Sequence, residues 1–138
     1  MAISFFQEDI RFDLKPKISY KSWLKKIAAN EGYKIIELNY IFCSDEYLYN
    51  INVEYLQHDT YTDIITFDNS EKEKEIEGDI FISVDRVKEN ATDEKISFDE
   101  EIKRVLSHGL LHLMGYKDKT EEQQKQMRIK EEESIALF

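Results

Sequence analysis

The chain has 138 residues, of which 41% are hydrophobic and 35% charged, so we expect one globular domain spanning residues 1–138. Its formal net charge of −10 argues against a protein that coats nucleic acid through a basic surface. The single cysteine, Cys43, excludes an internal disulfide and fits a reducing cytoplasm. The N-terminus lacks the apolar core of a signal peptide, and no apolar run is long enough to span a membrane.

The charge is unevenly distributed along the chain. Residues 1–34 carry seven Lys or Arg and four Asp or Glu, a net charge of +3, which leaves −13 for the remainder. This N-terminal excess could form a surface for an RNA backbone. An ordinary solvated helix face explains the same lysines and is the favoured interpretation.

Apolar alternation in the first half predicts two strands and two helices. The first strand runs from Ile3 to Leu14, with a break near residues 8–9, and Pro16 marks its end. A helix follows, with Ser19 as its cap and Gly32 after its end. Alternation over residues 34–43 predicts the second strand, and helical spacing predicts a helix over residues 45–56.

Two further strands are expected over residues 62–68 and 77–83. The charged link between them is short enough for an antiparallel pair. Asp63 and Asp79 stand in these strands, each either a partner of the functional site or a plain turn former. His58 precedes them in a polar connection, where solvent exposure is the default for a histidine.

The C-terminal third is predicted to be helical. A short helix is expected over residues 84–90, and Ser97 with Glu100 forms a capping pattern that starts an apolar helix over about 98–114. Thr120 caps a last helix that extends to about residue 136 and is interpreted as structural. The predicted fold class is therefore α+β, a small mixed sheet flanked by helices, with the apolar helix at its centre.

That central helix carries a potential metal site. His108 and His112 are two of the chain's three histidines, and a spacing of four residues places both imidazoles on one helix face. Gly115 stops the helix, and the following turn could bring Asp118 back as a third ligand. The alternative is a hydrogen-bonded pair of core histidines.

These residues also carry a family resemblance. The run His108-Gly109-Leu110-Leu111-His112-Leu113-Met114-Gly115-Tyr116 resembles the signature of the YbeY-type rRNA maturation endoribonucleases, which are bacterial metalloproteins. The segments Thr62-Asp63-Ile64-Ile65-Thr66-Phe67 and Gly78-Asp79-Ile80 resemble two strands of that family, in the same order.

The resemblance implies several properties. It implies a metal-dependent endoribonuclease that matures the 3′ end of small-subunit ribosomal RNA with a metal-activated water. It also implies that the ligands are His108, His112 and Asp118, with Asp118 in the place of the family's third histidine. The partners would be ribosomal RNA and small-subunit ribosomal proteins, with no membrane or DNA. The chain departs from the family at Leu56, where an arginine is usual.

The chemistry of the ligand set limits the possible reactions. Zinc is the expected ion, with manganese or magnesium possible because a carboxylate oxygen suits harder ions. A zincin-type protease needs Glu directly after the first histidine, and Gly109 stands there. Phosphodiester hydrolysis remains, with His58, Lys117 and Lys119 as candidate partners for phosphate. Two alternatives stay open: a non-catalytic ribosome-assembly factor with a structural metal, and a hydrolase of a small substrate.

Overall fold

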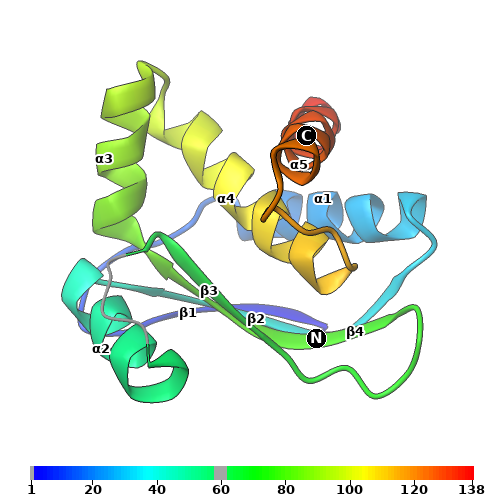
Figure 1. The fold of residues 1–138 in the computed structure, drawn as a ribbon, viewed down its shortest axis with the longest axis horizontal. Helices are drawn as coiled ribbons and strands as arrows, with labels where there is room; N and C mark the ends of the chain where they lie inside the picture. Colours follow the sequence, from blue (N-terminus) through cyan, green and yellow to red (C-terminus); the bar gives the residue numbers. More distant parts are fainter. Residues whose placement is uncertain (1, 58–61) are drawn as a thin grey trace.

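The computed structural model describes residues 2–57 and 62–138, which form a mixed α+β fold (Figure 1). Strands and helices are mingled along the chain rather than segregated. Among the described helices, none has the length and apolar character needed to cross a membrane. In chain order the elements are β1 (Ile3–Gln7), α1 (Lys17–Asn30), β2 (Lys34–Cys43), α2 (Asp45–Leu56), β3 (Ile64–Asp68), β4 (Glu75–Ser83), α3 (Val84–Glu94), α4 (Phe98–Leu113) and α5 (Glu121–Ala136).

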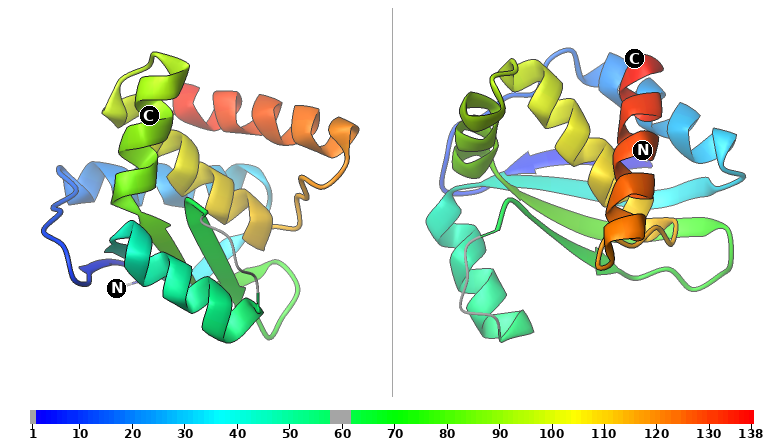
Figure 2. Two further views of the ribbon diagram at one scale, coloured as in Figure 1. Left: turned by 60° about the vertical axis from the view of Figure 1, so that its left-hand side comes forward. Right: turned by 45° about the horizontal axis from the view of Figure 1, so that its top comes forward.

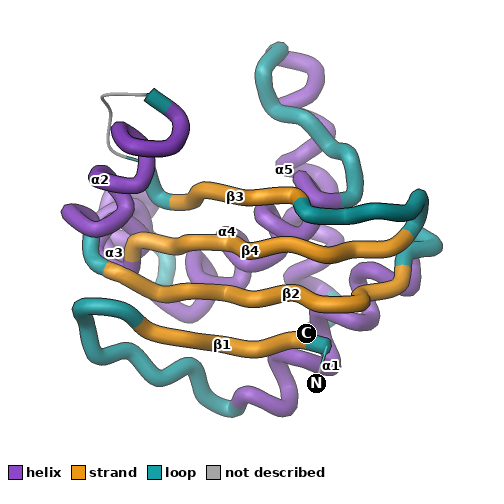
Figure 3. The backbone as a smooth tube through the Cα atoms, turned by 90° about the horizontal axis from the view of Figure 1, so that it is seen from below, coloured by secondary structure: helices purple, strands orange, loops and turns teal. Residues whose placement is uncertain are grey.

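The described strands form one sheet in the order β1-β2-β4-β3 (Figure 3). β1 and β4 each run parallel to β2, whereas β3 runs antiparallel to β4. The antiparallel pair follows from the short link between the two strands, as predicted, whereas the parallel pair β1-β2 needs a crossover, which α1 provides. The prediction of a mixed sheet is confirmed.

The helices are distributed unequally over the two faces of the sheet. α1, α4 and α5 lie over one face, whereas α2 lies at one end of the other (Figures 1 and 2). Trp23 on α1 donates its indole N–H to the carbonyl of Ser134 on α5, at 2.6 Å. This bond satisfies a buried polar group and ties two helices of the layer together.

α4 is the centre of the helical layer. Ser97 accepts a hydrogen bond from the amide of Glu100 and so caps the helix as predicted. Leu106 is fully buried, and its carbonyl accepts a hydrogen bond from the hydroxyl of Tyr40 on β2. A Cβ at Gly109 would lie 2.9 Å from side-chain atoms of Ile64 and Ile80, so glycine is what allows α4 to approach the sheet this closely.

The N-terminal segment differs from its prediction. β1 ends at Gln7 rather than Leu14, and Asp9, at φ +28°, accepts a hydrogen bond from the amide of Ser44. The alternating apolar residues beyond it pack without strand pairing, as Phe12 does against Phe42. The alternation of apolar residues in this segment therefore indicates which side chains are buried, and it does not indicate strand pairing.

Two helix boundaries were also predicted wrongly. α1 begins at Lys17 with Pro16 at the N-cap, so Ser19 lies inside the helix and does not cap it. Proline suits this position because its lack of an N–H costs nothing at the start of a helix. α3 continues to Glu94, one turn beyond the predicted end, and Ala91 is buried in that added turn.

Candidate metal centre

The histidine pair lies near the C-terminal end of α4, on the side of the helix that faces α5. Both side chains are partly buried. α4 ends at Leu113, and Gly115 then adopts φ +98°, a conformation that side chains other than glycine rarely take. The turn at Gly115 reverses the direction of the chain. The loop that follows brings Asp118 back to the two imidazoles.

Three ligand atoms converge at this point. Nε2 of His108 lies 3.0 Å from Nε2 of His112. The Oδ2 atom of Asp118 lies 3.4 Å from each of these nitrogens. A proton shared between the two rings accounts for the contact in the absence of an ion, and a cation bound by both nitrogens and the carboxylate would replace that proton.

The spacing of these atoms fits a divalent metal ion. Tetrahedral coordination with bonds of about 2.0–2.1 Å places neighbouring ligand atoms about 3.3 Å apart, close to the three observed separations. Within the described part of the chain, this cluster meets the geometric requirement for a metal site. His108, His112 and Asp118 could therefore hold one ion.

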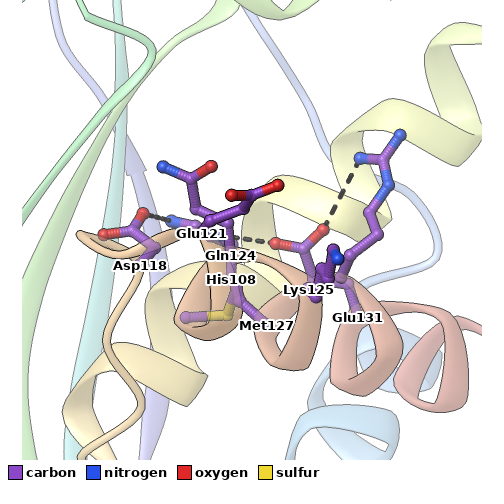
Figure 4. Close-up of a pocket in the computed structure, with 8 residues that line it drawn as sticks. His108, Asp118, Glu121, Gln124, Lys125, Met127 and Glu131 are labelled. Carbon is purple, nitrogen blue, oxygen red and sulfur yellow. Dashed lines mark hydrogen bonds and ion pairs between the residues drawn. The ribbon is translucent and has the colours of Figure 1, made fainter.

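A carboxylate from α5 orients the first histidine. Nδ1 of His108 lies 2.5 Å from Oε2 of the buried Glu131 (Figure 4). If this nitrogen carries the proton and donates it, the lone pair of Nε2 is directed at the ligand cluster, as in other carboxylate–histidine–metal arrangements. Burial lowers the pKa of His108, but the hydrogen bond and charge of Glu131 outweigh it and raise the pKa overall.

Glu131 is itself held by Arg104 of α4. A guanidinium N–H of Arg104 donates to Oε1 of Glu131 at 3.3 Å, and another donates to Oε1 of Glu132 at 2.8 Å. Both members of the Arg104–Glu131 pair are buried. The carboxylate therefore keeps one oxygen on the arginine and the other on the histidine, which fixes the orientation of the ring.

The sequence interpretation missed Glu131. The last helix was interpreted as structural, with no residue in the site. Glu131 instead joins the buried side of α5 with Met127 and Ser134. The one available signal was its spacing: 127, 131 and 134 recur at helical intervals on one face, but a glutamate in an acidic helix carries no mark of burial.

The other predicted site residues have different positions. Lys117 and Lys119 flank Asp118 and are exposed, so they can reach solvent beside the cluster. His58 lies outside the described residues. Asp79 lies on the opposite face of the sheet, where its carboxylate accepts a hydrogen bond from Asn39 at 3.0 Å, so it takes no part in the site.

Asp63 borders the site without holding the histidine ring. It directly precedes β3 and lines a cavity of about 280 Å³ together with His108 and Asp118. Burial is the main cause that raises the pKa of its carboxyl. A second, more open cavity of about 470 Å³ lies against α5, and His108 and Asp118 line it too (Figure 4). Both cavities therefore lie next to the ligand cluster and can admit a substrate.

Glu101, two turns before His108, should make the stability of the protein depend on pH. Burial raises the pKa of its carboxyl to about 7, although the charge of Arg104 opposes this. The folded protein then holds this proton more tightly than the unfolded chain. Glu101 consequently costs no stability below about pH 4.5, and its destabilising effect grows as the pH rises to about 7.

We expect Glu101→Gln to remove this dependence. The free energy of unfolding of the variant, relative to the wild type, should rise by up to about 3 kcal/mol between pH 4.5 and pH 8. Urea titrations of both chelated proteins across this range measure the difference. A constant difference at all pH values would show that Glu101 ionises in the folded protein as it does in the unfolded chain.

Comparisons with known proteins identify relatives of this chain. The family model described as Endoribonuclease YbeY matches residues 2–138. Endoribonuclease YbeY of Cytophaga hutchinsonii is 56% identical over 135 residues, which are 98% of this chain and 94% of that protein. The protein of the same name from Christiangramia forsetii is 54% identical over 136 residues, 99% of this chain and 94% of that protein.

A solved structure has a similar fold. The solution structure of TM1509 from Thermotoga maritima matches with a TM-score of 0.68 and 26% identity, covering 98% of this chain and 87% of that one. The family match and both relatives extend over nearly the whole chain, well beyond the histidine motif. The resemblance inferred from three sequence segments is thus confirmed, and the chain belongs to the endoribonuclease YbeY family.

Proposed function

We propose that this endoribonuclease matures ribosomal RNA by hydrolysis at a divalent ion held by His108, His112 and Asp118, acting at the 3′ end of the small-subunit RNA. One observation carries the proposal: three ligand atoms converge beside two cavities that can admit a substrate. We place the reaction in the cytoplasm, with small-subunit ribosomal proteins as further partners.

A divalent ion at this position would lower the pKa of a water molecule and polarise a phosphoryl oxygen, two contributions to phosphodiester hydrolysis. The residues of the chain prepare the site for it. Glu131 orients the ring of His108, and Arg104 holds Glu131 in place. Lys117 and Lys119, both exposed beside Asp118, are proposed contacts for the RNA backbone, as is His58.

We propose zinc as the resident ion. Two imidazoles and one carboxylate are a common zinc set in hydrolases that leave one coordination position open. Asp118 contributes a hard oxygen and a negative charge, which also makes the site acceptable to manganese or magnesium.

The ligand number bears on the alternative of a purely structural metal. Structural zinc sites usually have four protein ligands, whereas the cluster found among residues 2–57 and 62–138 has three. The larger cavity is also open rather than closed around the ligands, which suits a polymer better than a small enclosed substrate. These features favour catalysis on RNA.

The direct test combines metal analysis with an RNA cleavage assay. Purified protein should contain about one equivalent of divalent metal and cleave single-stranded RNA that carries the 3′ end of the small-subunit sequence. Chelation should remove both properties, and added zinc should restore them. Cleavage that persists at the wild-type rate in fully metal-free protein would exclude the proposed mechanism.

Asp118 offers a finer prediction. Asp118→His should tighten zinc binding and move the pH profile of cleavage to lower pH, because a more positive site favours loss of a proton from the nucleophilic water. Asp118→Ala should weaken zinc binding by more than about 100-fold, because it removes a direct ligand whereas loss of an outer-shell partner alone costs about 10- to 100-fold. Competition with a zinc-sensitive dye measures the affinities. If Asp118 only stabilises the loop, both variants will change the melting temperature and leave zinc affinity as it was.

A further inference from the structure

Both cavities at the ligand cluster share one exposed cation. The 470 Å³ and 280 Å³ cavities have four lining residues in common, namely His108, Asp118, Arg128 and Glu131. Arg128 is the positively charged member of this set. It lies on α5 one turn before Glu131, on the same helix face, and Glu131 in turn contacts His108. Its place in the chain thus puts a guanidinium beside the ligand cluster.

Carboxylates outnumber Lys and Arg side chains in the lining of both cavities. The larger one is lined by Asp118, Glu121 and Glu131 against Lys125 and Arg128. The smaller one is lined by four carboxylates against two arginines. RNA brings one negative charge per nucleotide, so a strand that enters this region meets repulsion unless a cation close to the site offsets it.

Arg104, the other arginine that lines the smaller cavity, is already paired with carboxylates of the protein. Its side chain is 9% exposed and forms hydrogen bonds with Glu131 and Glu132. A buried guanidinium paired to two carboxylates has little charge left for a ligand. Removing it would also release Glu131, so its role is to position the histidine ring.

Arg128 is, by contrast, available. Its side chain is 55% exposed, and its ion pair with Glu131 is long, at 3.8 Å. Within residues 2–57 and 62–138 it makes no hydrogen bond, and Glu131 already uses one oxygen for His108 and the other for Arg104. A guanidinium has five N–H donors in a planar fork that matches two phosphate oxygens.

We infer that Arg128 is a phosphate-binding residue that holds the RNA backbone next to the metal site. The inference rests on the proposed function, because it assumes that RNA is cleaved at this cluster. Lys125, the other cation of the larger cavity, has an ammonium group that acts as a point charge. The guanidinium of Arg128 can instead donate two hydrogen bonds to one phosphodiester and so fix its position.

The test compares Arg128→Gln, Arg128→Lys and the wild type on single-stranded RNA. Loss of a charge-assisted contact should lower kcat/KM for cleavage by about 10- to 100-fold in Arg128→Gln, and lysine should restore part of it. Equilibrium binding to the same RNA should weaken, and the slope of log affinity against log salt should become shallower by about 0.7. Lys88→Gln, which removes an equal charge from an exposed position of α3 outside both cavities and outside the basic N-terminal segment, should match the wild type.

The outcomes separate this inference from the proposed function. If Arg128→Gln cleaves and binds RNA with wild-type constants and salt slope, the inference is overturned while the proposed function stands. Weaker cleavage with an unchanged salt slope, or with lost metal, would overturn it as well, since Arg128 would then act through the fold or the metal. If the wild type fails to cleave RNA, the proposed function fails, and the salt slope of binding still decides the role of Arg128.

Discussion

Replacement of His112 by alanine is expected to abolish stoichiometric metal binding and, with it, RNA cleavage. His112 contributes one of the three converging atoms, and its loss leaves one imidazole and one carboxylate. Loss of even an outer-shell partner costs about 10- to 100-fold in metal affinity, so loss of a direct ligand should cost more than about 100-fold. Metal content by mass spectrometry and affinity by dye competition measure the effect.

His112 is a cleaner target than His108. Alanine at position 108 would also leave the buried carboxylate of Glu131 without its histidine partner and disturb folding. Asp79→Ala, a replacement on the opposite face of the sheet from the cluster, should retain a full equivalent of metal. Glu131→Gln should give an intermediate affinity, because the ring of His108 remains but is held less firmly. Wild-type metal content in His112→Ala would show that the ion binds elsewhere.

Leu106→Asp is expected to prevent folding. Leu106 is fully buried in the core cluster, at the point where α4 packs over the sheet. A carboxylate there would lose its hydration without gaining a compensating partner. We expect the free-energy cost to exceed the stability of the folded domain, which is typically about 5–15 kcal/mol. The near-ultraviolet circular dichroism of the variant should be lost, with no cooperative melting transition.

A second leucine provides the matched control. Leu56, at the end of α2, is 40% exposed, so Leu56→Asp should fold and melt within a few degrees of the wild type. Leu106→Ala should fold but lose about 2–5 kcal/mol of stability because of the cavity it leaves. A Leu106→Asp protein that melts cooperatively near the wild-type temperature would contradict the buried position of this side of α4.

The local features of the candidate metal centre could be predicted from the sequence. The four-residue spacing of His108 and His112 within an apolar helical pattern places both side chains on one face whatever the rest of the chain does, because the pitch of the helix sets it. Gly115 marks the end of that helix through its backbone freedom, and the return of Asp118 follows from the turn. These features depend on residues within about three helical turns.

The tertiary structure decided the rest. Glu131 and Arg104 meet His108 only because α4 and α5 pack together, and no spacing over 23 residues predicts which acid of an acidic helix becomes buried. The same packing places Arg128 beside the ligand cluster. β1 ends early, and Asp9 beyond it accepts a hydrogen bond from a residue 35 positions away, whereas the alternation that follows reflects burial alone. Periodicity reveals which side of an element is buried, but long-range packing selects the partners.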